Sequence, residues 1–230
     1  MLNERSGSWT TVDDRRGSLR EITTVFGLTV GGWLVLWILK GSFISFDFGQ
    51  ARLVRTFAAE AIYVILLWPW LAARGWSFGA IAGAPQPIDI WRGFGLAIAA
   101  YVAYYCSAYT WVVFVPGTYE VLQKATPVGT AAAWVITMGV ILNPIVEEFL
   151  WLGYGITALR RYGTRTAVLV SLSLRLFVHL YQGRLAFISV LPLAVVFTLY
   201  FVRTRRLWPV IVAHMLFDTL GLLSVVRHVH

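Results

Sequence analysis

Seven long apolar runs constrain the fold of this chain more than any other feature of its sequence. They fall at about residues 22–39, 56–72, 94–115, 130–159, 166–182, 186–202 and 208–226. A helix needs roughly 20 predominantly apolar residues to cross a membrane, and the lipid core tolerates only structures that pair their own backbone polar groups. The sequence therefore predicts an all-α protein, a multi-pass transmembrane bundle of about seven spanning helices.

The charge content indicates that lipid, rather than water, is the main solvent of the chain. Only 13% of its residues are charged, whereas a soluble domain averages about 25%. The net charge of +8 comes from basic residues scattered through short connectors. This pattern is typical of topology signals and contacts with an anionic lipid bilayer, and not of nucleic-acid binding. The single cysteine, Cys106, excludes an intrachain disulfide, and we expect a buried packing thiol there.

The domain organisation is simple. Residues 1–20 form a polar N-terminal tail, and residues 21–230 are predicted to form one transmembrane helical domain, because no connector is long enough to separate two. With the N-terminus inside the cell, the inner segments hold twelve basic residues and the outer segments six, while Arg175 falls within the fifth run. Basic residues concentrate in cytoplasmic connectors. We therefore expect a multi-pass protein of the cell membrane, such as a bacterial cytoplasmic membrane, with a cytoplasmic N-terminus.

Ionisable side chains interrupt the last four apolar runs at six positions: Glu147, Glu148, Arg175, His179, His214 and Asp218. Each central charge costs about 2.5–3.5 kcal/mol on insertion scales, and such residues usually face a bundle interior or a wet cavity. At about 1.5 Å per residue, both histidines and two of the acids fall in one layer, roughly 10–20 Å from the inner helix ends. The sequence therefore predicts that they meet in one site. Glu60, near the start of the second run, is expected at the membrane interface.

Spacing indicates the chemistry of this site. Two pairs share a helix face through their i,i+4 spacing: Arg175 with His179, and His214 with Asp218. Glu147 and Glu148 point about 100° apart on a helix, so at most one is central. A carboxylate beside a histidine in a low-dielectric pocket is a suitable general base for a water. A second histidine with an aspartate suits the stabilisation of an oxyanion or the orientation of a carbonyl. These features predict hydrolysis of a peptide or similar acyl bond inside the membrane.

Three ordered motifs then carry a resemblance to a known family. They are E-E-x-x-x-x-G at 147–153, H-L-Y-Q-G at 179–183 and H-x-x-x-D at 214–218, with R-T-R-R-L-W-P-V-I-V-A-H leading into the last. In this order they resemble the CPBP family (CAAX protease and bacteriocin-processing, or Abi) of glutamate-type intramembrane proteases. The resemblance covers about residues 140–222, within a CPBP-like core at about 130–226, and does not extend to the first three helices.

The resemblance implies a membrane endopeptidase that works without a metal or other cofactor. It implies that Glu147 and His179 activate a water and that His214 and Asp218 stabilise the oxyanion, with Glu148 as a supporting residue. Members of the family trim prenylated CAAX proteins, process or confer immunity to bacteriocin-like peptides, or cleave C-terminal sorting signals in bacteria. The partner expected here is a membrane-anchored or hydrophobic peptide or protein. The sequence predicts neither the substrate's identity nor an oligomeric state.

Two positions depart from the family's motifs. The first motif has an arginine where this chain has Leu152, and the second has a phenylalanine where this chain has Arg175. One helix has lost an arginine and another has gained one in line with His179. Our hypothesis is that Arg175 supports the site by supplying the missing positive charge, paired with Glu148 or Glu147.

Two alternative functions, and one alternative chemistry of the site, compete with a metal-free protease. The missing motif arginine favours an inactive family member that serves as an immunity or scaffold protein in the membrane. Two histidines with an aspartate and a glutamate are acceptable zinc ligands, although the chain has no H-E-x-x-H motif. A transporter or channel would line a continuous path with its charges, whereas these charges gather in one layer.

Two residues beside the glutamates suggest local structure. Pro144 precedes them by about one turn, and we expect a helix distortion there that opens space for water. Gly153 follows them, and its lack of a side chain is expected to allow the close approach of another helix.

Overall fold

A computed structural model describes residues 17–40, 50–124 and 131–226 of the chain. Most of the N-terminal tail expected at 1–20 lies outside these residues. The described part is helical and without strands, which confirms the all-α fold class. Its first half contains α1 (Leu19–Lys40), α2 (Gln50–Ala72), α3 (Phe78–Ala82), α4 (Pro87–Phe114) and α5 (Thr118–Lys124).

The second half contains longer, composite helices. The first runs through α6 (Ala133–Glu148), the π-helix η1 (Phe149–Ile156), α7 (Thr157–Leu159) and the short η2 (Arg160–Tyr162). The second joins α8 (Thr164–Val178) to η3 (Leu180–Gln182), and the third joins η4 (Ala186–Val190) to α9 (Leu191–Thr204). The last helix is α10 (Trp208–Val226). Each of the seven predicted apolar runs coincides with one of these helices, and the short α3 and α5 were not predicted.

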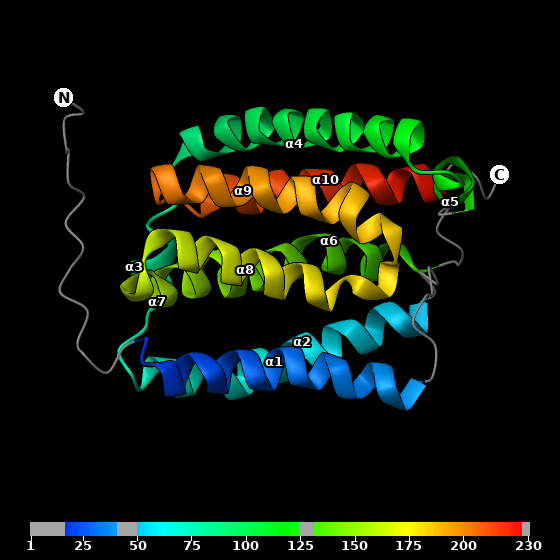
Figure 1. Cartoon of the computed structure of the whole chain (residues 1–230). Coiled ribbons are helices and arrows are strands. Elements are labelled where there is room, and N and C mark those ends of the chain that lie inside the picture. The colour runs from blue at the N-terminus through cyan, green and yellow to red at the C-terminus, as the bar shows by residue number, and fades with distance from the viewer. Residues whose placement is uncertain (1–16, 41–49, 125–130, 227–230) are drawn as a thin grey trace, which may run out of the picture.

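Four helical segments of the described residues are long and apolar enough to cross a membrane: Leu53–Ala72, Pro87–Phe114, Ala133–Tyr162 and Ala186–Thr204. Figure 1 shows the long helices lying nearly parallel, with α4, α9 and α10 on one side, α6 and α8 in the middle, and α1 and α2 on the other side. In this arrangement α6 packs against both α2 and α10, and α8 packs against η1 and α9. The glutamates at the end of α6 therefore lie within reach of three other helices.

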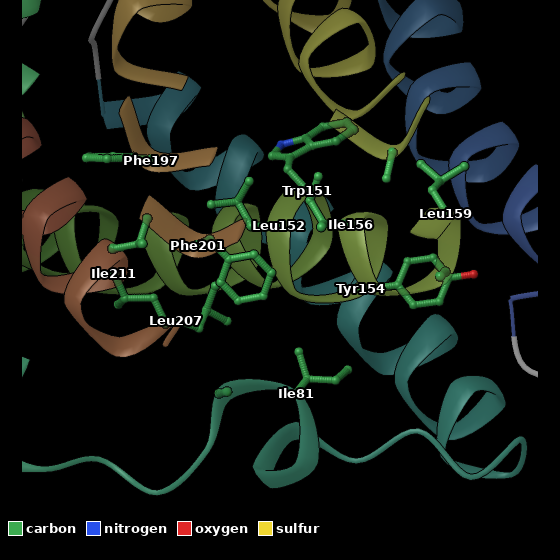
Figure 2. Packing of buried hydrophobic residues seen from close by; sticks show 14 of the residues in the cluster. Ile81, Trp151, Leu152, Tyr154, Ile156, Leu159, Phe197, Phe201, Leu207 and Ile211 are labelled. Carbon is green, nitrogen blue, oxygen red and sulfur yellow. The ribbon is translucent and has the colours of Figure 1, made fainter. Parts of the chain in front are cut away.

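The apolar core of the described residues is centred on the π-helix η1. Trp151, Leu152, Tyr154 and Ile156 are all buried, and Figure 2 shows them beside side chains from α3, α9 and α10. Gly153 allows the close packing that we expected, because a Cβ there would lie 2.7 Å from Ile81 Cγ2. A larger residue would push the α3 segment away from η1.

The helix irregularity lies after the glutamates, so our expectation of a distortion at Pro144 is wrong in position. Pro144 lies within the regular turns of α6, and the wide π turns begin at Phe149. In π turns each backbone hydrogen bond spans five residues, whereas in an α-helix it spans four. Ser171 of α8 donates a hydrogen bond of 2.7 Å to the carbonyl oxygen of Trp151. A side chain of the neighbouring helix α8 thus satisfies a backbone carbonyl group of η1.

Two buried acids connect the helices away from the glutamates, and the sequence did not indicate either. Glu21 of α1 accepts hydrogen bonds from Trp76 Nε1 at 3.0 Å and from the Tyr154 hydroxyl at 3.1 Å. Asp89, in the first turn of α4, forms a bidentate pair with Arg206 at 2.6 and 2.7 Å. These pairs stabilise the packing of α1 on η1 and of α4 on the connector between α9 and α10.

Cys106 is exposed, so our expectation of a buried thiol is wrong. It lies on α4, an outer helix of the bundle in Figure 1. In a membrane an apolar residue does not need burial in protein, because lipid tails solvate it as well as a protein core does.

Candidate active site

The six ionisable residues predicted to form a site come together from three helices. Glu147 and Glu148 are the last residues of α6, and Arg175 lies in the last turn of α8. His179 is the C-cap residue of α8, and α10 supplies His214 and Asp218. Hydrogen bonds and ion pairs link all six in one continuous cluster.

Glu148 is the buried centre of the cluster. Its side chain is fully buried, and the Arg175 guanidinium donates to both of its oxygens, at 2.6 Å from Nη2 and 3.1 Å from Nη1. His214 Nδ1 lies 2.6 Å from Oε1 of the same carboxylate. A charge buried without partners is costly, and a bidentate arginine is its strongest partner. Glu148 is therefore a paired acid that fixes Arg175 and His214 in place.

Glu147 has a different environment, although it is the adjacent residue. Its side chain is 21% exposed, and its nearest cation, Arg175 Nη2, is 3.6 Å from Oε2. The other oxygen, Oε1, is 3.9 Å from His179 Nε2. Both distances exceed those of good hydrogen bonds. The Glu147 carboxylate thus keeps acceptor capacity for a water or a substrate, which the Glu148 carboxylate does not.

The orientation of His179 follows from one backbone contact. Its Nδ1 lies 2.8 Å from the carbonyl oxygen of Arg175. A carbonyl oxygen only accepts, so Nδ1 carries the hydrogen, and in the neutral ring Nε2 is then an acceptor. This acceptor faces Glu147 Oε1 across 3.9 Å. Two acceptors at that separation can be bridged by one water that donates to both.

The chain turns sharply after His179, and this turn completes the H-L-Y-Q-G motif. His179 ends α8, the 3₁₀ turn η3 follows, and Gly183 ends it with a φ of +59°. Glycine adopts a positive φ without strain, whereas residues with a Cβ rarely do. The Tyr181 ring stacks beside the His179 ring at a centroid distance of 6.3 Å. The motif thus places the histidine at a fixed helix end.

His214 lies between two carboxylates. Its Nδ1 contacts Glu148, as described, and its Nε2 is 3.6 Å from Asp218 Oδ1. The second distance is too long for a direct hydrogen bond, so Nε2 remains available to another group. The sequence predicted the pairing of His214 with Asp218 by i,i+4 spacing, but not the shorter contact with Glu148, which comes from a different helix.

Two residues near the cluster were missed by sequence reasoning. Glu60 was expected at the membrane interface, which is wrong, because it lies in the middle of α2 and is only 7% exposed. The helix begins at Gln50, before the apolar run, so hydropathy misplaced the helix end. Tyr101 of α4 donates a hydrogen bond of 3.2 Å to the carbonyl oxygen of Phe217, next to Asp218. A lone acid in an apolar helix was the available signal for Glu60, and no signal marked Tyr101.

Comparison with known protein families places this cluster in context. Residues 129–220 match the family model described as type II CAAX prenyl endopeptidase Rce1-like. This segment is Rce1-like. The match confirms the resemblance to the CPBP family, and the Rce1-like segment contains all six residues of the cluster. Glu60 lies outside it. No curated protein and no solved structure matches the chain.

The arrangement of the acidic and histidine side chains bears on the zinc alternative. Within residues 17–40, 50–124 and 131–226, no group of three or more His, Cys, Asp or Glu side chains is arranged to hold a metal ion. Whether the reaction is independent of metal stays a prediction.

Proposed function

We propose that this chain is an intramembrane endopeptidase that hydrolyses a peptide bond in a membrane-anchored or hydrophobic protein or peptide. The Rce1-like segment supports a CAAX-type membrane protease in general terms. The single observation that carries the finer proposal is the pair of acceptors, Glu147 Oε1 and His179 Nε2, that face each other across 3.9 Å. General bases of this kind activate water in hydrolytic enzymes.

The attacking group in this mechanism is a water held between Glu147 and His179. Its oxygen attacks the carbonyl carbon of the scissile bond, and one of its protons passes to this pair. The carbonyl oxygen becomes an oxyanion. When the tetrahedral intermediate collapses, the C–N bond breaks, the amine nitrogen takes up a proton and the acyl product keeps the water oxygen as part of its new carboxyl group. Each turnover consumes one water.

We assign the oxyanion to His214. When both of its ring nitrogens carry hydrogen, Nδ1–H donates to Glu148 and Nε2–H is free to donate to the developing charge. Asp218, 3.6 Å from Nε2, is then placed to orient the ring and the substrate. Arg175 balances the charge of Glu148 and takes the place of the motif arginine that is missing at position 152. Leu152 itself is fully buried in the apolar core.

The membrane orientation that we propose has the N-terminus and the basic connectors in the cytoplasm. In Figure 1 the start of α1, α7, the end of α9 and the start of α10 lie at the same end of the bundle. The segments at this end carry Arg160, Arg161, Arg203, Arg205 and Arg206. Such an excess of basic residues supports a cytoplasmic location of this end.

The function is tested with the purified protein in lipid nanodiscs and a panel of membrane-anchored peptides, by mass spectrometry of the products. We expect one defined cleavage by the native chain. Glu120→Gln serves as a control, because this acid is exposed on α5, away from the cluster. Equal product from the native chain and from the variants of the cluster, or none from any of them, would favour the scaffold alternative.

His179→Asn separates the chemistry of His179 from its structural role. Asparagine retains a donor for the Arg175 carbonyl oxygen but has nothing in place of Nε2. We expect kcat to fall by about 10²–10⁴-fold while the thermal unfolding midpoint stays close to that of the native chain. Peptide cleavage and thermal unfolding in detergent measure the two effects. A His179→Asn variant that cleaves at the native rate would exclude His179 from the reaction.

A further inference from the structure

Glu60 reaches the candidate active site from a helix outside the Rce1-like segment. It lies on α2, which packs directly against α6. Its buried carboxyl group lies near enough to Glu147, Asp218 and His214 for their charges to act on it, without a direct contact to any of them. These three residues come from α6 and α10, so the buried carboxyl group of Glu60 lies on the side of α2 that is turned toward the cluster.

The environment of Glu60 indicates its chemical state. The residue is 7% exposed, and its buried Oε2 has no hydrogen-bond partner among the residues that the structure describes. Arg175, the permanent cation of the cluster, is engaged by Glu148 and Glu147. A buried carboxylate without a partner is costly, and such a group takes up a proton instead. Glu60 is therefore best described as a neutral carboxylic acid, with one O–H to donate.

The proposed reaction leaves a task for such a group. Glu147 and His179 accept a proton from water early in the reaction, whereas the amine nitrogen needs a proton when the C–N bond breaks. An amine leaves poorly without it. All six residues of the cluster, Asp218 included, already have assigned contacts or roles. Glu60 is the acid of the site that has neither.

We propose that Glu60 is a further catalytic residue, the general acid that protonates the leaving amine; this inference rests on the proposed peptidase function. The Glu60 O–H gives its proton to the amine nitrogen as the C–N bond breaks. The resulting carboxylate recovers a proton from Glu147, which took it from water. Over one turnover the acyl carbon gains the water's OH and the amine gains its H, so both acids return to their starting states.

The test compares two substrates that share one acyl group: a membrane-anchored peptide, and an ester with a leaving group that needs no protonation. For Glu60→Gln we expect kcat on the peptide to fall roughly 100-fold or more with KM nearly unchanged. We expect the ester to be cleaved within about 3-fold of the native rate, because its leaving group departs without an acid. A purely structural role would lower both rates equally, and that result would overturn the proposal.

Further variants keep the test decisive. Glu147→Gln should slow both substrates, because water must be activated for each. Should Glu60→Gln fail to fold, Glu60→Asp retains the acid on a shorter side chain and should slow the peptide roughly 10-fold more than the ester; an equal effect on both would again overturn the proposal. If the native chain cleaves neither substrate, the peptidase function itself is wrong. If it cleaves both and Glu60→Gln changes neither rate, only the role of Glu60 is wrong.

Discussion

Replacing Glu147 by glutamine is expected to lower kcat for a membrane-anchored peptide by about 10²–10⁴-fold, with little change in KM. Glutamine keeps the size of the side chain but cannot accept a proton from water. The fold should persist, because Arg175 retains its bidentate contact with Glu148. Steady-state cleavage in nanodiscs measures the loss, and thermal unfolding checks the fold.

The adjacent acid provides the sharpest comparison for this variant. Glu148→Gln removes the charge that balances Arg175 and weakens the contact with His214, so it should lower stability as well as activity. Glu120→Gln should change neither. A Glu147→Gln variant that retains activity within about 3-fold of the native chain would remove Glu147 from the role of general base, since loss of that role costs far more.

Replacing Arg175 by leucine is expected to destabilise the protein by about 3–5 kcal/mol, because it leaves a buried carboxylate without its cation. Glu148 would then keep only the contact with His214. We also expect hydrolysis to be lost, because that contact positions the residue assigned to the oxyanion. Chemical unfolding in mixed micelles measures the stability, and peptide cleavage measures the activity.

A double variant distinguishes the two roles of this ion pair. Apolar replacement of both partners of a buried pair is often neutral for stability. Glu148→Leu with Arg175→Leu should therefore recover most of the stability lost in Arg175→Leu but remain inactive, because His214 Nδ1 loses its acceptor. A single Arg175→Leu variant that is as stable and as active as the native chain would contradict the idea that this arginine replaces the one missing at position 152.

Hydropathy was enough to predict the positions of the long helices, because each had to supply its own stretch of apolar side chains. The clustering of the charged residues was also predictable, because ionisable side chains within a membrane span face the bundle interior and pair with one another. The different environments of Glu147 and Glu148 were not predictable. Adjacent residues differ by about 100° on a helix, and which of them faces inward depends on how α6 is rotated against α8 and α10.

The burial of Glu60 and the π-helix after Glu148 were also beyond the reach of sequence reasoning. Both depend on contacts between distant segments, such as the Ser171 hydroxyl on the Trp151 carbonyl oxygen and the packing of α2 on α6. The π turns carry no proline or other local signal at Phe149 itself. Glu60 was misplaced because its helix continues through polar residues that a hydropathy pattern treats as connector.

The central claim is that a water held by Glu147 and His179 attacks the scissile peptide bond directly. A single-turnover cleavage in H₂¹⁸O, with the native chain in excess over a membrane-anchored peptide, tests it by mass spectrometry of the new C-terminus. Direct attack predicts one ¹⁸O in that carboxyl group in the first turnover and no acyl group bound covalently to the protein during the reaction. Product that carries only ¹⁶O, or an acyl group found on the protein by mass spectrometry, would mean that a group of the protein attacks first. The absence of any cleavage would contradict the peptidase function itself.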